Sequence, residues 1–300
     1  VRGSAVSIVA NTSLNIAVNM TDVVQTRSEV VELALAQAGV QQGDIGALGL
    51  AASGILVAVA VAISLWWQLG LERSLLWAAL RALVQLLLVG WVLQFVVDPD
   101  DPLIFSVLWL LAMVGFAAYT TSRRAAGVPK VLPLSLLAYT ASAIVVLGVL
   151  FGFGIYELEG RTLVPLAGMV VGNSLAATVL VSRQLLIAAT EQRGLIEARL
   201  ALGLTAKQAF QPQLRQALRT ALVPQIESTK AVGIVFLPGA MVGLILAGVD
   251  PADAVKVQVS VMYLVLGSVA TTTAVMSLGI SRELFTPAQQ LRRQTTSTDT

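Results

Sequence analysis

The sequence predicts an all-α membrane protein with about seven transmembrane helices and one long cytoplasmic loop between the fifth and the sixth. Two observations carry this prediction. Hydrophobic residues make up 56% of the 300 residues and charged residues only 12%, whereas soluble domains carry roughly 25% charged residues. Apolar stretches also recur at the length of about 20 residues that a helix needs to cross a bilayer. Because this small number of charged residues cannot cover a water-facing surface, we interpret the chain as an integral membrane protein.

Residues 1–45 precede the first apolar stretch, and we expect them to form a leader outside the membrane. The segment is mildly polar and lacks the basic start and compact apolar core of a secretion signal. Residues 29–38 have the composition of one short amphipathic helix, which Gly39 would end. No function follows from this leader, and a dispensable extension fits its residues as well as a folded element does.

The apolar stretches predict the membrane-spanning helices. The second contains Arg81, and the sixth contains Glu227 and Lys230 near its start; the other five are free of charge. We therefore expect residues 46–285 to form one membrane domain and residues 286–300 a polar cytoplasmic tail. The predicted spans are 46–66, 74–97, 102–120, 131–152, 162–182, 221–247 and 257–280.

The distribution of lysine and arginine predicts the orientation. If the odd-numbered spans end on the cytoplasmic side, the cytoplasmic segments hold 13 Lys and Arg and 5 Asp and Glu, and the opposite segments hold 4 and 11. Cytoplasmic loops of membrane proteins carry the excess of Lys and Arg. The asymmetry predicts a multi-pass protein of the cell membrane with its N-terminus outside and its C-terminus in the cytoplasm.

Several kinds of chemistry are excluded by residues that the chain lacks. It has no cysteine and no histidine, which removes thiolate and imidazole metal ligands, disulfides and every Ser-His or Cys-His catalytic arrangement. It also lacks the Gly-x-x-x-x-Gly-Lys-Ser/Thr loop that cradles nucleotide phosphates. With no paired carboxylates in the spans either, a membrane enzyme is a poor interpretation, and we expect no cofactor bound by this chain.

The polar segment 183–220 is the one long cytoplasmic loop in this topology. Apolar residues recur at helical spacing before Gly203, and Thr205 followed by Gln208 is a capping-box signature that predicts a second helix starting at Thr205. We expect Pro212 to limit this second helix, because proline interrupts the helical hydrogen bonds. The predicted arrangement is a helix, a corner at Gly203 and a short transverse helix.

Two interpretations of this transverse element remain open from periodicity alone. A rigid helix that is continuous with the spans and offers an apolar face is suited to being moved by a soluble ATPase. An ordinary amphipathic helix at the membrane surface fits the same pattern, with Arg193, Arg199 and Lys207 among anionic headgroups.

Polar residues within the spans require a reason, because a charge there costs about 2.5–3.5 kcal/mol even on the most lenient scale. Arg81 and Gln85 are four residues apart and share one helix face, which favours a structural or pathway role. Glu227 and Lys230 are three apart and can pair. For these two, snorkelling toward the interface competes with a role in transport.

Two further stretches are candidates for a transport pathway. Asn173 lies beside the small residues Gly168 and Gly172, where tight helix packing and a pathway role both fit. Pro238 and Gly239 interrupt the sixth span and predict a kink or break, and broken helices in transporters often line cavities. Met241 follows, and a thioether suits a soft metal; a purely structural kink is the alternative.

Several motifs resemble those of one permease family. "EARLALG" (197–203) is similar to the Glu-Ala-Ala-x-x-x-Gly motif of ABC-transporter permeases, with Arg199 in place of the second alanine. "LRALVQLLLVGWVL" (80–93), "PLAGMVVGNSLAATVLVSRQL" (165–185) and the run from Gly194 to about Gly267 resemble the family of FetB-type bacterial iron exporters and plant aluminium-tolerance permeases. The similarity extends over about residues 46–285.

This resemblance implies a permease subunit that exports a metal ion such as iron, or a metal-linked solute, and that is driven by a separate ATPase. The implied partners are an ABC ATP-binding subunit, which supplies ATP, a second copy of the permease and the lipid bilayer of the cell inner membrane, with no nucleic acid. A self-sufficient secondary transporter or channel stays open as an alternative, with Glu227 as its ion-carrying residue. The metal ligands stay unknown. The residues implied in ATPase coupling are Glu197, Ala198, Gly203, Thr205 and Gln208, and those in the pathway are Arg81, Gln85, Asn173, Glu227, Lys230, Pro238, Gly239 and Met241.

Overall fold

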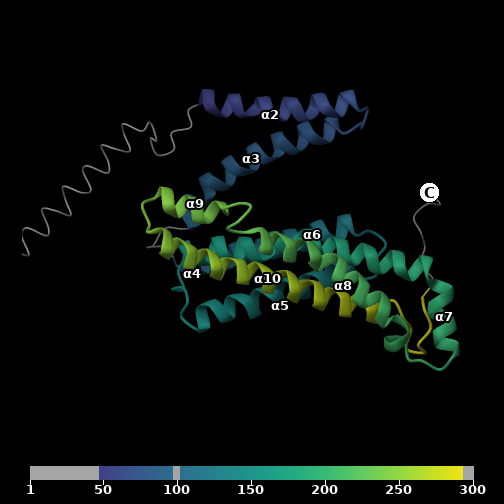
Figure 1. The fold of residues 1–300 in the computed structure, drawn as a ribbon. Coiled ribbons are helices and arrows are strands. Elements are labelled where there is room, and N and C mark those ends of the chain that lie inside the picture. Colours follow the sequence, from purple (N-terminus) through teal and green to yellow (C-terminus); the bar gives the residue numbers. More distant parts are fainter. Residues whose placement is uncertain (1–46, 97–101, 293–300) are drawn as a thin grey trace, which may run out of the picture. The chain divides into compact units, whose positions relative to one another are not determined.

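The computed structural model describes residues 47–96 and 102–292, and these residues form the helices α2 to α10 (Figure 1). The leader 1–45 with its predicted helix 29–38, and the last eight residues of the predicted tail, 293–300, lie outside the described residues. The chain divides into two units, Val1–Gln85 and Leu86–Thr300, and each is described by itself.

The first unit contains α2 (Ala47–Trp66) and the first part of α3 (Glu72–Val96). The turn between them is fixed by the buried Ser64, whose hydroxyl donates to Glu72 Oε1 at 2.7 Å and accepts from Leu71 N at 3.2 Å. Trp66 and Trp67 are exposed beside this turn. Aromatic residues are enriched where a membrane meets water, which is consistent with a turn at that level.

The second unit is a bundle whose centre is α10 (Pro251–Glu283). It packs against α5 (Val131–Gly152) and α6 (Gly160–Glu191), and α4 (Leu103–Arg124) packs against the same two helices. The helix α8 (Ala206–Ala231) lies against α6 and α10 (Figure 1). The short α7 (Arg193–Ala201) joins α6 to α8 at one end of the bundle.

Hydroxyl groups are buried among the apolar side chains of this core. Ser174, Thr178 and Ser182 recur every four residues along α6, and each donates to the carbonyl four residues earlier at 2.6–2.7 Å. Such bonds satisfy the hydroxyls within their own helix. Other bonds cross between helices: the hydroxyl oxygens of Thr121 on α4 and Tyr139 on α5, both fully buried, are 2.9 Å apart, and Ser142 on α5 donates to the carbonyl of Ser268 on α10 at 3.2 Å.

Five helices of the described part are long and apolar enough to cross a membrane, and they lie in α3, α4, α5, α6 and α10. They coincide with five of the seven predicted spans. The predicted first span, 46–66, corresponds to α2, a helix of 20 residues that includes the apolar stretch Ala52–Trp66. The fold is therefore that of a helical membrane protein, and the count of seven spans stays a prediction.

The predicted sixth span, 221–247, is not one continuous helix. The helix α8 ends at Ala231, residues 232–238 are non-helical, and α9 runs over Gly239–Leu246. The break begins earlier than the predicted Pro238–Gly239 position, because Gly233 adopts φ +83°, a conformation open to glycine, and donates from its N–H to the carbonyl of Phe236 at 2.9 Å. Pro238 is instead the residue that precedes α9.

The prediction that Pro212 limits a short transverse helix is wrong. The helix α8 continues through both Pro212 and Pro224. A buried face that includes Phe210, Gln213 and Ala217 packs against the bundle on either side of Pro212, and this packing outweighs the lost backbone hydrogen bond. The segment 183–220 is consequently helical for most of its length.

Candidate functional site

The corner between α7 and α8 is the candidate site, and Gly203 makes its sharp turn. The N–H of Gly203 donates to the carbonyl of Leu200 at 2.9 Å, and that of Leu204 donates to Arg199 at 3.2 Å. This is the pattern of a helix end closed by a residue in the left-handed conformation, and Gly203 has φ +88°. The turn leaves Leu202 82% exposed at its tip.

The start of α8 confirms the capping box predicted at Thr205. The Thr205 hydroxyl accepts from the N–H of Gln208 at 3.4 Å, and the Gln208 side chain accepts from the N–H of Thr205 at 3.0 Å. Two backbone donors at the helix start are thereby satisfied. The corner is thus held by local hydrogen bonds on both sides of Gly203.

The side chain of Arg199 on α7 connects this helix to α8 by hydrogen bonds. Its guanidinium donates to the carbonyl of Ala209 and to Gln213 Oε1, both at 3.1 Å. The Gln213 amide in turn donates to Gln192 Oε1 at 2.9 Å. Because Arg199 is used in this way, it does not lie free to contact lipid headgroups as the membrane-surface interpretation required.

The chain returns to this corner after α10. We call residues 284–292 the C-terminal strap. The Gln289 side chain accepts from the N–H of Ala206 at 2.9 Å, which caps α8 from outside. Leu291 is buried, and the ring of Phe285 meets that of Phe210 edge-on, with centroids 5.8 Å apart. The described part of the predicted polar tail, 286–292, therefore contacts the start of α8.

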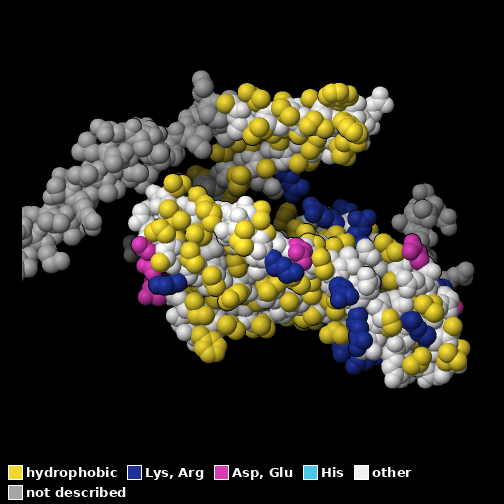
Figure 2. Space-filling model, viewed as in Figure 1, with side chains coloured by type: hydrophobic (Ala, Val, Ile, Leu, Met, Phe, Trp, Pro, Cys, Tyr) yellow, Lys and Arg dark blue, Asp and Glu magenta, His cyan; other side chains and the backbone are white. Residues whose placement is uncertain are grey.

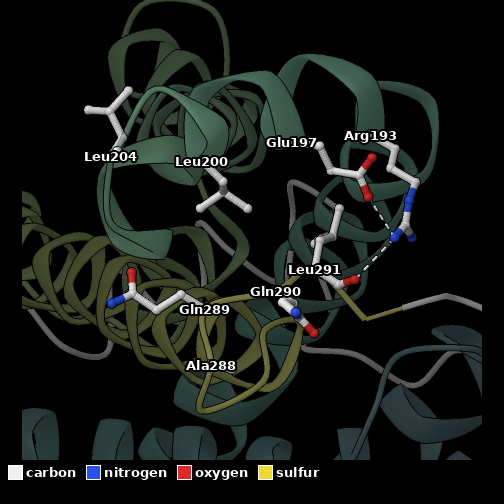
Figure 3. Close-up of a pocket in the computed structure, with 9 residues that line it drawn as sticks. Arg193, Glu197, Leu200, Leu204, Ala288, Gln289, Gln290 and Leu291 are labelled. Atoms are coloured by element: carbon white, nitrogen blue, oxygen red, sulfur yellow. Dashed lines mark hydrogen bonds and ion pairs between the residues drawn. The ribbon is translucent and has the colours of Figure 1, made fainter.

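Arg193 connects α7 to the strap. It forms an ion pair with Glu197 at 2.7 Å and donates to the carbonyls of Leu291 at 3.1 Å and Arg292 at 3.3 Å. Figure 3 shows its guanidinium between Glu197 and the backbone of Leu291. The second arginine of the membrane-surface interpretation is therefore also engaged within the protein.

Together, α7, the corner and the strap enclose a pocket of about 530 Å³. Of the predicted coupling residues, Glu197 and Gly203 line it, Thr205 and Gln208 form the adjoining cap, and Ala198 is exposed on α7. The lining residues are Arg193, Glu197, Leu200, Gly203, Leu204, Ala288, Gln289, Gln290 and Leu291 (Figure 3).

The strap residues were missed by sequence reasoning. Their local signal is weak: Leu291 is a single apolar residue in a polar stretch that follows Pro287. For Arg193 and Arg199, a place among lipid headgroups was one of the two interpretations that the sequence left open. Arg193 contacts carbonyls of the strap and Arg199 contacts α8 across the corner, and periodicity alone could not identify these partners.

The predicted pathway residues are spread over several elements. Arg81 and Gln85 are exposed on α3, and Asn173 is exposed on α6, where its amide donates to the carbonyl of Met169 at 2.9 Å. A Cβ added at Gly172 would meet nothing within 4 Å, so the face of α6 at this position is not packed against the described residues, although Val170 and Ser174 beside it are buried.

The sixth predicted span contributes the remaining pathway candidates. Glu227 and Lys230 form the predicted ion pair, at 2.9 Å, on an exposed face of α8. Pro238, Gly239 and Met241 lie together at the start of α9, just after the break. Across the described residues 47–96 and 102–292, no group of three or more carboxylates that could hold a metal ion comes together.

Comparison with known proteins identifies relatives along most of the chain. Residues 47–285 match the model of a family described as "Uncharacterised protein family (UPF0014)". The "UPF0014 membrane protein STAR2" of Oryza sativa subsp. japonica is 36% identical over 82% of this chain and 86% of its own length. No solved structure matches the chain.

Two further relatives have names that state or suggest a function. The "Probable iron export permease protein FetB" of Escherichia coli (strain K12) is 35% identical over 81% of this chain and 93% of its own length. The "Protein ALUMINUM SENSITIVE 3" of Arabidopsis thaliana is 34% identical over 83% of this chain and 91% of its own length.

Proposed function

This chain belongs to the UPF0014 family, and from that membership we propose that it is the membrane-spanning permease subunit of an ABC transporter that exports a metal ion or a metal-linked solute. The name of the Escherichia coli relative supports export and a metal cargo, iron in that protein. A separate ATPase subunit hydrolyses ATP, and two permease copies form the complex.

The observation that carries the proposal is the rigid corner between α7 and α8. The helices α6 and α10 contain 32 and 33 residues, so each is roughly 48–50 Å long at 1.5 Å per residue. The hydrocarbon core of a bilayer is about 30 Å thick. Helices of this length extend well beyond it, which supports a corner that projects into water toward a soluble partner.

The distribution of charge supports a position of this corner on the cytoplasmic side, where ATP is available. The segments on that side include 183–220 and hold most of the lysine and arginine of the loops. In the proposed orientation the N-terminus lies outside and the C-terminus, with the strap, in the cytoplasm.

Transport requires a pathway, which we assign to the polar residues of α3, α6 and α8 and to the start of α9. We expect Arg81→Ala to impair transport or assembly, because an intramembrane arginine is kept only where it is used. Arg73→Ala, at the start of the same helix, is the matched control. Full transport by the Arg81 variant would remove Arg81 from the pathway.

The proposal is tested by purifying the tagged chain from native membranes and assaying ATPase activity in what accompanies it. We expect a stoichiometric ATP-binding subunit whose activity responds to a metal in a screen. Glu197→Ala and Gly203→Ala should lower recovery of that subunit without changing membrane insertion. A lone chain without an ATPase would contradict the proposal and favour a secondary transporter, with Glu227 the first residue to replace.

A further inference from the structure

The pocket at the corner has two walls that come from distant parts of the chain. One wall is α7 with the turn, which contributes Leu200 and Leu204. The other is the strap, which contributes Ala288, Gln289 and Gln290 (Figure 3). All three strap side chains are exposed, so a molecule that reaches into the pocket from solvent meets both walls at once.

The strap is held firmly enough to be part of a binding surface. It is attached at its start to α10, in its middle through Gln289 to the N–H of Ala206, and at its end through the Arg193 guanidinium to two carbonyls. Its buried Leu291 anchors it between these points. A surface that is ordered before its partner arrives loses less conformational entropy on binding.

The chemistry around the pocket indicates the kind of partner. Leu202 and Leu195 are exposed apolar side chains on the corner and on α7. Basic side chains gather on the half of the second unit that carries α7 (Figure 2). In the segment 193–220, Glu197 is the one acidic residue and is paired with Arg193, and the other basic residues are Arg199, Lys207, Arg215 and Arg219.

Apolar side chains rimmed by positive charge complement a protein surface that has an apolar depression with carboxylates at its edge. We propose that the ATP-binding subunit docks across both walls of this pocket, so that the C-terminal strap is part of its binding site together with the corner. This inference rests on the proposed function, because it takes the ATPase as the partner.

Because the chain has no cysteine, a single introduced thiol tests the proposal directly. The experiment compares Ala288→Cys with Ala252→Cys, a matched exposed alanine at the far end of α10. Each variant is purified with the ATPase subunit that accompanies it and, separately, without that subunit, and is treated with a polyethylene-glycol maleimide. We expect the ATPase subunit to abolish labelling at position 288 and to leave labelling at position 252 unchanged.

The outcomes separate this inference from the proposed function. Equal labelling at position 288 with and without a bound ATPase subunit would overturn the strap as a docking wall while leaving the permease assignment intact. Recovery of no ATPase subunit with the unmodified chain would overturn both. A chain that ends at Arg292 retains the strap and should bind the subunit as the full chain does. Loss of binding in that variant would assign docking to residues 293–300 instead and would also overturn the proposal.

Discussion

At the scale of single residues, the corner shows which contacts can be predicted from a sequence. Thr205 and Gln208 are three residues apart and hydrogen-bond to each other. The backbone at position 203 has a positive φ, which glycine adopts without strain. Both features were predicted because their causes are local. The hydrogen bonds of Arg199 were not predicted, because its acceptors on α8 become neighbours only after the chain has turned.

Gly203 provides a stability prediction with a matched control. We expect Gly203→Ala to lower the free energy of unfolding by about 1 kcal/mol, because alanine is strained at positive φ; a Cβ there would meet no atom within 4 Å, so no clash contributes. Gly194→Ala, inside α7 and equally unobstructed, should be neutral or stabilising. Thermal unfolding followed by far-UV circular dichroism in detergent measures both, and equal effects would contradict the expectation.

The buried pair of hydroxyl groups between α4 and α5 provides a second stability prediction. We expect Tyr139→Phe to lower the free energy of unfolding by about 1 kcal/mol or slightly more, because the buried Thr121 hydroxyl loses its partner at 2.9 Å. Tyr263→Phe is the control, since Tyr263 on α10 is exposed. The same unfolding assay applies, and an unchanged midpoint for Tyr139→Phe would indicate that Thr121 finds another hydrogen-bond partner.

At the scale of elements, α8 and α9 show where local rules were overridden. The sequence pattern placed a helix end at Pro212 and a break at Pro238. In the structure, the packing of the α8 face carries the helix past two prolines, and the chain leaves the helix at Val232 and Gly233 instead. The helix α5 has the predicted bounds, 131–152, but α6 continues nine residues past the predicted end at 182 and α10 begins six residues before the predicted start at 257, because a helix can extend into polar sequence beyond its apolar run.

The proline inside the second half of α8 yields a prediction about this helix. We expect Pro224→Ala to raise the free energy of unfolding by about 1–3 kcal/mol, since alanine restores a backbone donor and removes a steric conflict in a helix interior. Pro251→Ala is the control, because Pro251 lies at the first position of α10, where proline costs nothing. Thermal midpoints of the two variants give the comparison, and a lower midpoint for Pro224→Ala would show that the helix needs its kink.

At the scale of the whole molecule, composition was sufficient to predict a helical membrane protein, but it could not predict what covers the break after α8. Ile234 is 90% exposed and Val235 77% exposed on the second unit. Irregular backbone is not tolerated against lipid; it occurs at membrane depth only where protein or a water-filled cavity covers it. As part of the predicted sixth span, the exposed break would therefore require a cover beyond the described contacts of its own unit.

We expect a second copy of the permease to supply that cover. Ile234→Cys, oxidised in native membranes, should give a covalent dimer in the otherwise cysteine-free chain, whereas Ile144→Cys, exposed on the regular helix α5, should not. Non-reducing gel electrophoresis reads the result. Labelling of Ile234→Cys by a water-soluble maleimide without cross-linking would instead place the break in a water-lined pathway.

Because α8 is long, a tilt of this helix at the corner moves its other end by a large distance. The helix contains 26 residues between the corner and the break, which is roughly 39 Å at 1.5 Å per residue. Tilting such a rod by about 5° about one end displaces the other end by roughly 3 Å, which is more than half of the rise per helical turn. A nucleotide-driven tilt of α8 at the corner would therefore reach residues 232–238, where the backbone has already left the helix, as a displacement of this size.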